Sequence, residues 1–129
     1  MRKILVVDDQ PDIRRMMRYA LVPEFAVQEA ASGAEALASI LADAPDAVLL
    51  DIMMPGELDG LELCARIKAD PSLARIHVVL MTAMAQVADQ ERGLALGADA
   101  YFSKPFSPAA LTRHLQAALG MGAQPGAPA

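Results

Sequence analysis

Five polar side chains of this sequence stand where short apolar runs end. They are Asp8 and Asp9 after the first run, Asp51 after the third, Thr82 after the fourth and Lys104 after the fifth. If the runs are parallel strands, their carboxyl ends meet at one edge of the sheet, where ligands bind in open α/β folds. Carboxylates, a hydroxyl and an ammonium group would then share one crevice.

Carboxylates gathered in this way repel each other. Two unit charges roughly 4 Å apart cost about 4 kcal/mol at an effective dielectric constant of about 20. The cluster therefore either binds protons or recruits a cation, and hard oxygen ligands around a small open site suit Mg²⁺, which a phosphate can complete. Aspartate is also a nucleophile that forms aspartyl-phosphates. Asp51 is our candidate for that role.

The remaining polar residues fit the needs of phosphoryl transfer. In-line transfer depends on positioning and on neutralising the charge of the equatorial oxygens. Mg²⁺ would supply two positive charges and Lys104 a third, while the hydroxyl of Thr82 would donate to a remaining oxygen. Ala83 is small and leaves room for the group. The set is sufficient to form an acyl phosphate on Asp51.

The elements that position these residues alternate along the chain. Apolar residues fill consecutive positions from Ile4 to Val7, as expected for a parallel strand covered on both faces. Strands are predicted at residues 3–7, 25–30, 47–50, 76–81 and 100–103. Helices are predicted at residues 11–21, 35–41, 61–67, 87–96 and 108–119, the last with Ser107 as its N-cap. Strands that alternate with helices predict an α/β fold with a parallel sheet.

Length and charge limit the function classes. The 129 residues fit one domain with one core, which we place at 1–119, and the Gly- and Pro-rich residues 120–129 are interpreted as a flexible tail or the start of a linker. The formal net charge of −5 argues against direct nucleic-acid binding. The amino-terminal apolar run is too short for a signal peptide or a membrane span. We therefore expect a cytoplasmic domain without a membrane partner.

Taken together in order, the motifs resemble a known family. Asp8-Asp9, Asp51-Ile-Met-Met-Pro-Gly56, Thr82-Ala83 and Lys104-Pro105 are similar to the receiver domain of two-component response regulators. The resemblance runs from about residue 2 to 119. It implies a flavodoxin-like (βα)5 three-layer sandwich whose five-stranded parallel sheet has the order 2-1-3-4-5, a fold for which a member of this family is a standard example.

The resemblance also implies a role for each site residue. Asp51 would be the phosphoacceptor, and Lys104 would pair with the phosphoryl oxygens. Asp9 and Asp51 would hold Mg²⁺ directly, Asp8 would hold it mainly through water, and the backbone carbonyl of Met53 would be a further ligand. The activity implied is self-phosphorylation from a phosphodonor and autodephosphorylation, and not that of an ordinary enzyme.

Partners follow from the same resemblance. A sensor histidine kinase or a histidine phosphotransfer protein would donate the phosphoryl group. Thr82 would then move toward it and Tyr101 would turn inward, as the two switch residues. This shift would alter the face made by the fourth helix, fifth strand and fifth helix, where a downstream effector protein is expected to dock.

Two alternatives and several structural interpretations stay open at this point. An aspartyl-nucleophile phosphohydrolase usually has a second acid two positions after the nucleophile, where this chain has Met53. A receiver fragment of a larger multidomain regulator is the other alternative. His77 and His114 show no shared pattern and are interpreted as unrelated structural residues. Met16 is assigned to the core and Arg14 to a solvated face or a partner surface, together with its neighbours Arg15 and Arg18.

Overall fold

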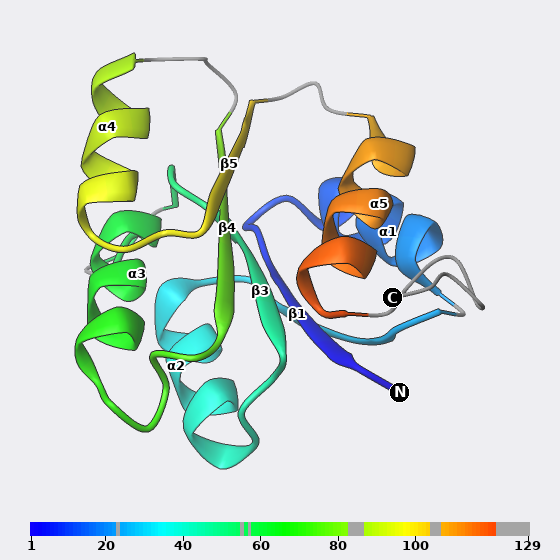
Figure 1. Cartoon of the computed structure of the whole chain (residues 1–129), viewed down its shortest axis with the longest axis horizontal. Coiled ribbons are helices and arrows are strands. Elements are labelled where there is room, and N and C mark those ends of the chain that lie inside the picture. The colour runs from blue at the N-terminus through cyan, green and yellow to red at the C-terminus, as the bar shows by residue number, and fades with distance from the viewer. Residues whose placement is uncertain (23, 55, 57, 83–86, 104–106, 121–129) are drawn as a thin grey trace.

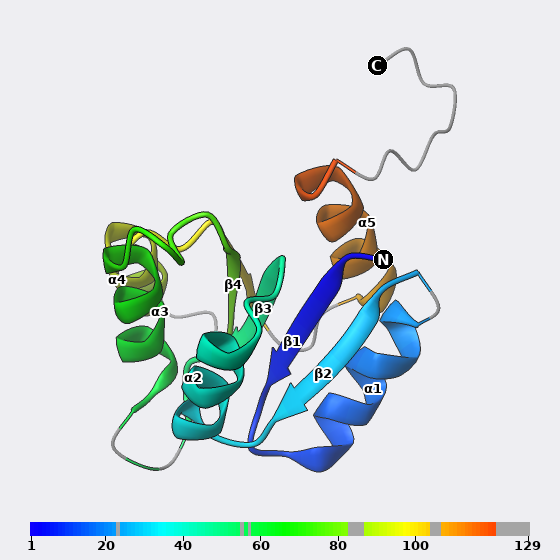
Figure 2. The ribbon, with the colours of Figure 1, turned by 90° about the horizontal axis from the view of Figure 1, so that it is seen from below.

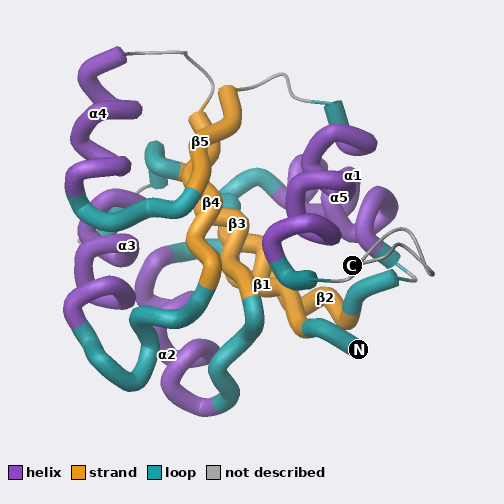
Figure 3. Tube along the Cα trace, in the orientation of Figure 1, coloured by secondary structure: helices purple, strands orange, loops and turns teal. Residues whose placement is uncertain are grey.

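The fold is an alternation of strands and helices around one sheet (Figures 1 and 3). The computed structural model describes residues 1–22, 24–54, 56, 58–82, 87–103 and 107–120. The elements are β1 (Lys3–Val7), α1 (Pro11–Leu21), β2 (Ala26–Ala30), α2 (Gly33–Ala42), β3 (Ala47–Asp51), α3 (Gly60–Ala69), β4 (His77–Thr82), α4 (Val87–Ala95), β5 (Ala100–Ser103) and α5 (Pro108–Ala118). No helix in this described part is long and apolar enough to cross a bilayer.

The sheet confirms the predicted topology. Its strands run parallel in the order β2-β1-β3-β4-β5. β1 lies beside β3, with Val7 opposite Leu50, and β3 lies beside β4. This order brings the carboxyl ends of β1, β3, β4 and β5 next to one another, which is the condition for a shared site.

Helices cover both faces of the sheet and make three layers (Figure 2). One apolar cluster joins α1 and α5 to the sheet through buried residues that include Met17, Leu49 and Leu115. A second cluster, which includes Leu50 and Ile67, lies on the opposite face of the sheet, where α2 and α3 pack. All five residues of β3 are buried, which explains why its sequence is apolar without alternation.

Two strands begin one residue later than predicted. The amide of Phe25 donates to the carbonyl of Leu21 at the end of α1, 3.0 Å away, and not to the sheet. The amide of Ile76 likewise donates to the carbonyl of Leu73, 2.9 Å away, in the turn after α3. Both side chains are buried. The prediction included them because they are apolar, although their amides do not join the hydrogen bonds of the sheet.

Helix ends follow from capping residues. α2 begins at Gly33, two residues before the predicted start, because the Ser32 hydroxyl accepts a hydrogen bond from the amide of Glu35. Ser107 caps α5 as predicted, accepting from Ala110 at 3.2 Å. α4 ends before Gly97, whose φ of +103° is the left-handed conformation that glycine adopts without strain.

Met16 and Leu41 are among the apolar helix residues that lie outside the core. Met16 is 38% exposed, so its assignment to the core is wrong, whereas its neighbour Met17 is buried. Leu41 is 65% exposed, while Ile40 is buried. Consecutive helical residues point about 100° apart, so each helix buries one member of the pair and leaves the other at the margin of its apolar stripe.

Candidate functional site

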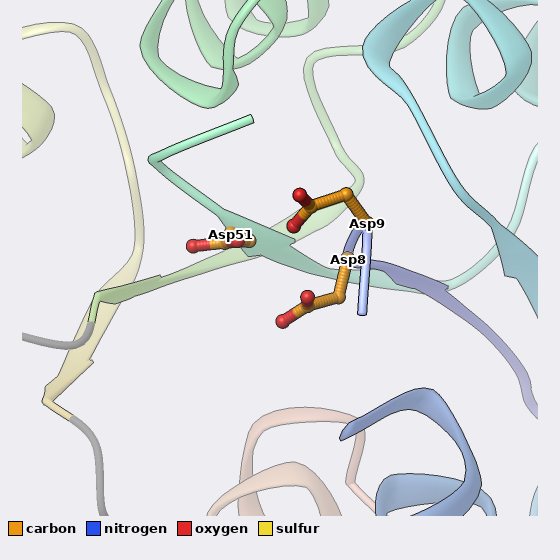
Figure 4. Close-up of side chains that lie close together, drawn as sticks. All are labelled: Asp8, Asp9 and Asp51. Carbon is orange, nitrogen blue, oxygen red and sulfur yellow. The ribbon is translucent and has the colours of Figure 1, made fainter. Parts of the chain in front are cut away.

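Three carboxylates meet at the carboxyl edge of the sheet. Asp8 and Asp9 follow β1 and Asp51 ends β3, and each offers an oxygen within 4.8 Å of the other two. Figure 4 shows the side chains reaching into a common space. In the described part of the chain this is the only group of three or more acidic, histidine or cysteine residues that could hold a metal ion.

Backbone contacts fix Asp8 in place. Its amide donates to the carbonyl of Ala30 on β2, and its Oδ1 accepts from the amide of Gln10, 2.9 Å away. Arg14 Nη1 donates to the carbonyl of Asp8 over 2.6 Å. The side chain of Asp8 is fully buried, so these contacts hold a carboxylate inside the protein next to two others.

Asp51 is positioned by the end of β3 and by a close backbone approach. It pairs with Met81 in the ladder, is 5% exposed, and its Oδ1 accepts from the amide of Met53, 3.2 Å away. Gly60 lies against the Asp51 carbonyl, because a Cβ at Gly60 would stand 2.2 Å from that oxygen. The start of α3 can therefore pack here only through a glycine.

Asp9 and Met53 form the open side of the cluster. Asp9 is exposed, and the side chain of Met53 is 69% exposed. A cation could therefore reach the carboxylates from solvent while Asp8 and Asp51 hold it from beneath. The role predicted for the Met53 carbonyl stays a prediction.

Of the other predicted site residues, Thr82 stands at the same edge, Tyr101 lies within β5, and the rest lie outside the described residues. Thr82 ends β4, is 3% exposed and pairs with Ser103 of β5. Tyr101 on β5 is partly buried and packs against the apolar cluster on the α2 and α3 face. Lys104 and Ala83 lie outside the described residues.

The donor set fits a hard divalent cation. Two carboxylates 4.8 Å apart repel by about 3.5 kcal/mol at an effective dielectric constant of about 20. Only oxygen atoms are offered, which suits Mg²⁺ rather than a metal that prefers nitrogen or sulfur. The residues present therefore match the predicted cofactor in charge, donor type and access.

Arg14 is a positioning residue that sequence reasoning missed. Its Nε and that of Arg18 donate to the two carboxylate oxygens of Glu29, over 3.0 and 2.6 Å. The hydrogen bond from Arg18 is the largest influence on the pKa of Glu29 and holds it below its usual value. Burial raises this pKa by less, and Arg14 lowers it further. The predicted solvated face is thus wrong for Arg14, which ties α1 to β2 and to Asp8. Only Arg15 of the three lacks such a contact among the interactions described.

The two histidines correct another interpretation. His77 and His114 are not unrelated, because their Nε2 atoms lie 2.9 Å apart. They stand at the opposite edge of the sheet from the carboxylates, since His77 is the first residue of β4. No pattern in the sequence signals a contact across 37 residues.

Comparison with known proteins decides the family. The family model of the response regulator receiver domain matches residues 4–116. The chain belongs to this family. Receiver domains are phosphorelay modules, so the match confirms the predicted fold and function class and does not favour the phosphohydrolase alternative.

Relatives of this receiver domain are regulators of about twice its length. It is 42% identical over 119 residues to the probable transcriptional regulator ycf27 of Guillardia theta, covering 91% of this chain and 45% of the relative. It is 40% identical over 123 residues to the transcriptional regulatory protein ResD of Bacillus subtilis, covering 95% and 50%. The chain thus spans about half the length of these curated relatives.

Two of the solved structures that are similar to this receiver domain have nearly its own length. A putative response regulator from Chloroflexus aurantiacus superposes with a TM-score of 0.86 at 32% identity, over 92% of this chain and 98% of that one. The chemotaxis protein CheY4 of Vibrio cholerae gives a TM-score of 0.84 at 30% identity, with the same coverage. The match in topology therefore extends over almost the whole domain.

Proposed function

We propose that Asp51 is the phosphoacceptor of this receiver domain and takes its phosphoryl group from a sensor histidine kinase or a histidine phosphotransfer protein. The main observation that supports this proposal is that oxygen atoms of three carboxylates lie within 4.8 Å of one another at the carboxyl edge of the sheet. In the transfer, the P–N bond to the donor imidazole breaks as a P–O bond to an Asp51 oxygen forms.

The residues around Asp51 prepare it for this step. The amide of Met53 donates to Oδ1 and so sets the plane of the carboxylate. Gly60 and the β4 ladder fix the backbone on both sides of the acceptor. A nucleophile held in this way loses little conformational freedom on reaching the transition state, which is the main help that a protein gives phosphoryl transfer.

Mg²⁺ is the cofactor in this proposal. When bound, it offsets the charge of the carboxylates and of the transferring group. Asp9 and Asp51 would hold the ion directly, Asp8 mainly through water, and the Met53 carbonyl would complete the protein ligands. Asp8 supports this role through its fixed position, since Gln10 and Arg14 hold its side chain and its carbonyl.

Thr82, Lys104 and Tyr101 are proposed as the residues that sense the phosphoryl group. Thr82 would donate to a phosphoryl oxygen, Lys104 would neutralise another, and Tyr101 would turn inward. The β4–β5 ladder supports a coupling, because it pairs Leu80 with Tyr101 and Thr82 with Ser103. The face made by α4, β5 and α5 would then change and be read by a downstream effector.

The output is proposed to lie beyond this domain. Relatives named as transcriptional regulators are about twice as long, which favours a receiver that belongs to a larger DNA-binding regulator. The receiver itself would make no nucleic-acid contact, in keeping with its net charge of −5. The proposal also places it in the cytoplasm, where the buried thiol of Cys64 would stay reduced.

A phosphodonor experiment tests the acceptor. The protein is incubated with acetyl phosphate and Mg²⁺, and its intact mass is measured with and without EDTA. We expect one added phosphoryl group in the wild type, none in Asp51→Ala or with EDTA, and normal labelling in Asp12→Ala, which removes an exposed carboxylate of α1. Labelling of Asp51→Ala would overturn the assignment, and immediate loss of the label after donor removal would favour a hydrolase.

A further inference from the structure

The two histidines of the chain form a contact between α5 and the sheet. His77 begins β4 and His114 lies on α5, and their Nε2 atoms are 2.9 Å apart. The rings are tilted by 39°, with centroids 5.0 Å apart. Both residues are partly buried, so water reaches the pair but does not surround it.

Charged groups behind His77 extend this contact to the other face of the sheet. Asp99, just before β5, accepts at Oδ2 from the amide of Val78 and from Lys68 Nζ of α3, each 2.8 Å away. The same oxygen lies 3.9 Å from Nδ1 of His77. Lys68, Asp99, His77 and His114 therefore form a row that joins α3 to α5 around the amino end of β4.

The geometry restricts where protons can sit. A contact of 2.9 Å between two Nε2 atoms requires a proton on one and a lone pair on the other. The carboxylate of Asp99 favours a proton on Nδ1 of His77, which leaves its Nε2 as the acceptor and makes His114 the donor. His114 can donate whether it is neutral or protonated.

A proton on Nε2 of His77 changes what His114 must do. A neutral His114 could still accept from it after moving its own proton to Nδ1, but when both rings are protonated two N–H groups face each other and two positive rings repel. We propose that the His77–His114 pair is a proton-sensitive contact, which holds α5 on the sheet while at least one ring is neutral and opens when His77 is protonated beside a protonated His114. This inference does not depend on the phosphoacceptor assignment.

The surroundings set the pH range. Burial is the largest cause that lowers the pKa of His77, and His114 and Lys68 lower it further, whereas Asp99 raises it. A histidine pKa lowered by folding means that the contact stabilises the protein fully above the unfolded value of about 6.5. That stabilisation is lost as the pH falls through the lowered pKa of the folded state.

Opening of the contact would reach the α5 and β5 surface. The ring of Phe102 on β5 stands edge-on to His114, with centroids 5.5 Å apart and planes at 70°. Leu111 and Leu115 on the same helix are fully buried against the sheet. A shift of His114 would therefore disturb the packing of α5 beside β5, on the face proposed for an effector.

Titration of the ring signals by NMR tests the proposal. The wild type, His114→Gln and His77→Gln are compared in EDTA, because a divalent metal would compete with protons for the nitrogen atoms. Glutamine can donate or accept at the partner position but does not titrate. We expect the wild-type rings to titrate in two steps separated by more than about 1 pK unit, and the His77 step to move to higher pH in His114→Gln.

The response of α5 provides the second readout. Amide signals of Leu111 and Leu115 are expected to shift with the His77 step in the wild type and to lose that shift in His77→Gln. Independent titration of the two rings, or an unchanged His77 pKa in His114→Gln, would overturn the proposal. The proposal would also fail if the α5 amide signals did not change with the His77 step. A two-step titration seen only when EDTA is left out would indicate a bound metal instead.

Discussion

The two edges of the sheet differ in the charged side chains that their described residues bring together. At the amino edge, cations and carboxylates form pairs, with Lys68 Nζ 2.8 Å from Asp99 and Lys3 Nζ 2.5 Å from Asp43. At the carboxyl edge, three carboxylates lie within 4.8 Å of one another. The first arrangement stabilises the fold without a ligand, whereas the second would gain stability from the Mg²⁺ proposed to bind there. The amino edge therefore helps to hold the domain together, and the carboxyl edge is the one proposed to perform its chemistry.

The largest expected effect concerns the backbone at the carboxyl edge. Gly60→Ala should lower the free energy of unfolding by about 3 kcal/mol, because its Cβ would meet the Asp51 carbonyl oxygen at 2.2 Å, and backbone cannot move aside cheaply. Urea unfolding followed by circular dichroism measures the change.

Gly93→Ala is the matched control for this substitution. The atom nearest to its Cβ would be Leu80 Cδ1, at 2.3 Å, which is the far end of a side chain and not backbone, and alanine raises the helix propensity of α4 by about 1 kcal/mol. A loss under about 1 kcal/mol is expected. Equal losses in the two variants would show that the close approach at Asp51 has no special rigidity.

A smaller loss is expected at the amino edge. Lys68→Met removes the partner of Asp99 and the donor to the carbonyls of Ala74 and Ile76, 2.9 and 2.6 Å away. The Lys68 side chain is only 14% exposed, so the lost hydrogen bonds should cost about 2 kcal/mol.

Lys3→Met provides the comparison within the same edge. Its pair with Asp43 is open to solvent, with side chains 37% and 54% exposed, so the cost should stay under about 0.5 kcal/mol. Urea unfolding at low and high salt distinguishes the two, because salt screens the exposed pair. Equal losses would mean that the pairing around Lys68 is not what stabilises this edge.

An effect of opposite sign is expected at the acidic cluster. Asp8→Asn removes a charge but keeps an oxygen that can accept from Gln10. Without divalent metal it should raise the unfolding free energy by about 1 kcal/mol, because repulsion between the carboxylates falls. Added Mg²⁺ should stabilise the variant less than the wild type.

Thermal unfolding with EDTA and with Mg²⁺ measures both parts of this prediction. Asp12→Asn, which changes an exposed carboxylate of α1, controls for the altered net charge and should leave the response to Mg²⁺ unchanged. A loss of stability in Asp8→Asn without metal would contradict the idea that the carboxyl edge is held under repulsion.

Sequence reasoning was strongest where burial decides the residue type. β3 is buried on both faces and had to be apolar, so its position and the polar residue at its end were both predictable. The first residue of a strand was harder to predict. Whether the amide of Phe25 donates to a helix carbonyl or to a neighbouring strand depends on the conformation of the turn and not on the apolar character of the residue. The convergence of Asp8, Asp9 and Asp51 followed from strand order and is confirmed as a geometry.

Contacts made by side chains from distant elements were not predictable. Arg14 contacts Asp8 and Glu29 because of the way α1 packs beside β1 and β2. The spacing of apolar residues in α1 does not predict that packing. His77 and His114 lie in contact because the first residue of β4 faces the turn of α5 that carries His114. The roles of Thr82 and the other switch residues likewise stay predictions that the phosphorylated state must test.

The ion pairs of Glu29 also bear on how the molecule behaves beside other copies of itself. β2 is an outermost strand of only five residues and exposes Gln28 and Glu29. Arg14 and Arg18 hold the Glu29 carboxylate in place on this margin. A fixed charge on a short outer strand discourages a strand of a second molecule from adding to the sheet. The same contacts that orient α1 therefore protect the sheet from edge-to-edge aggregation.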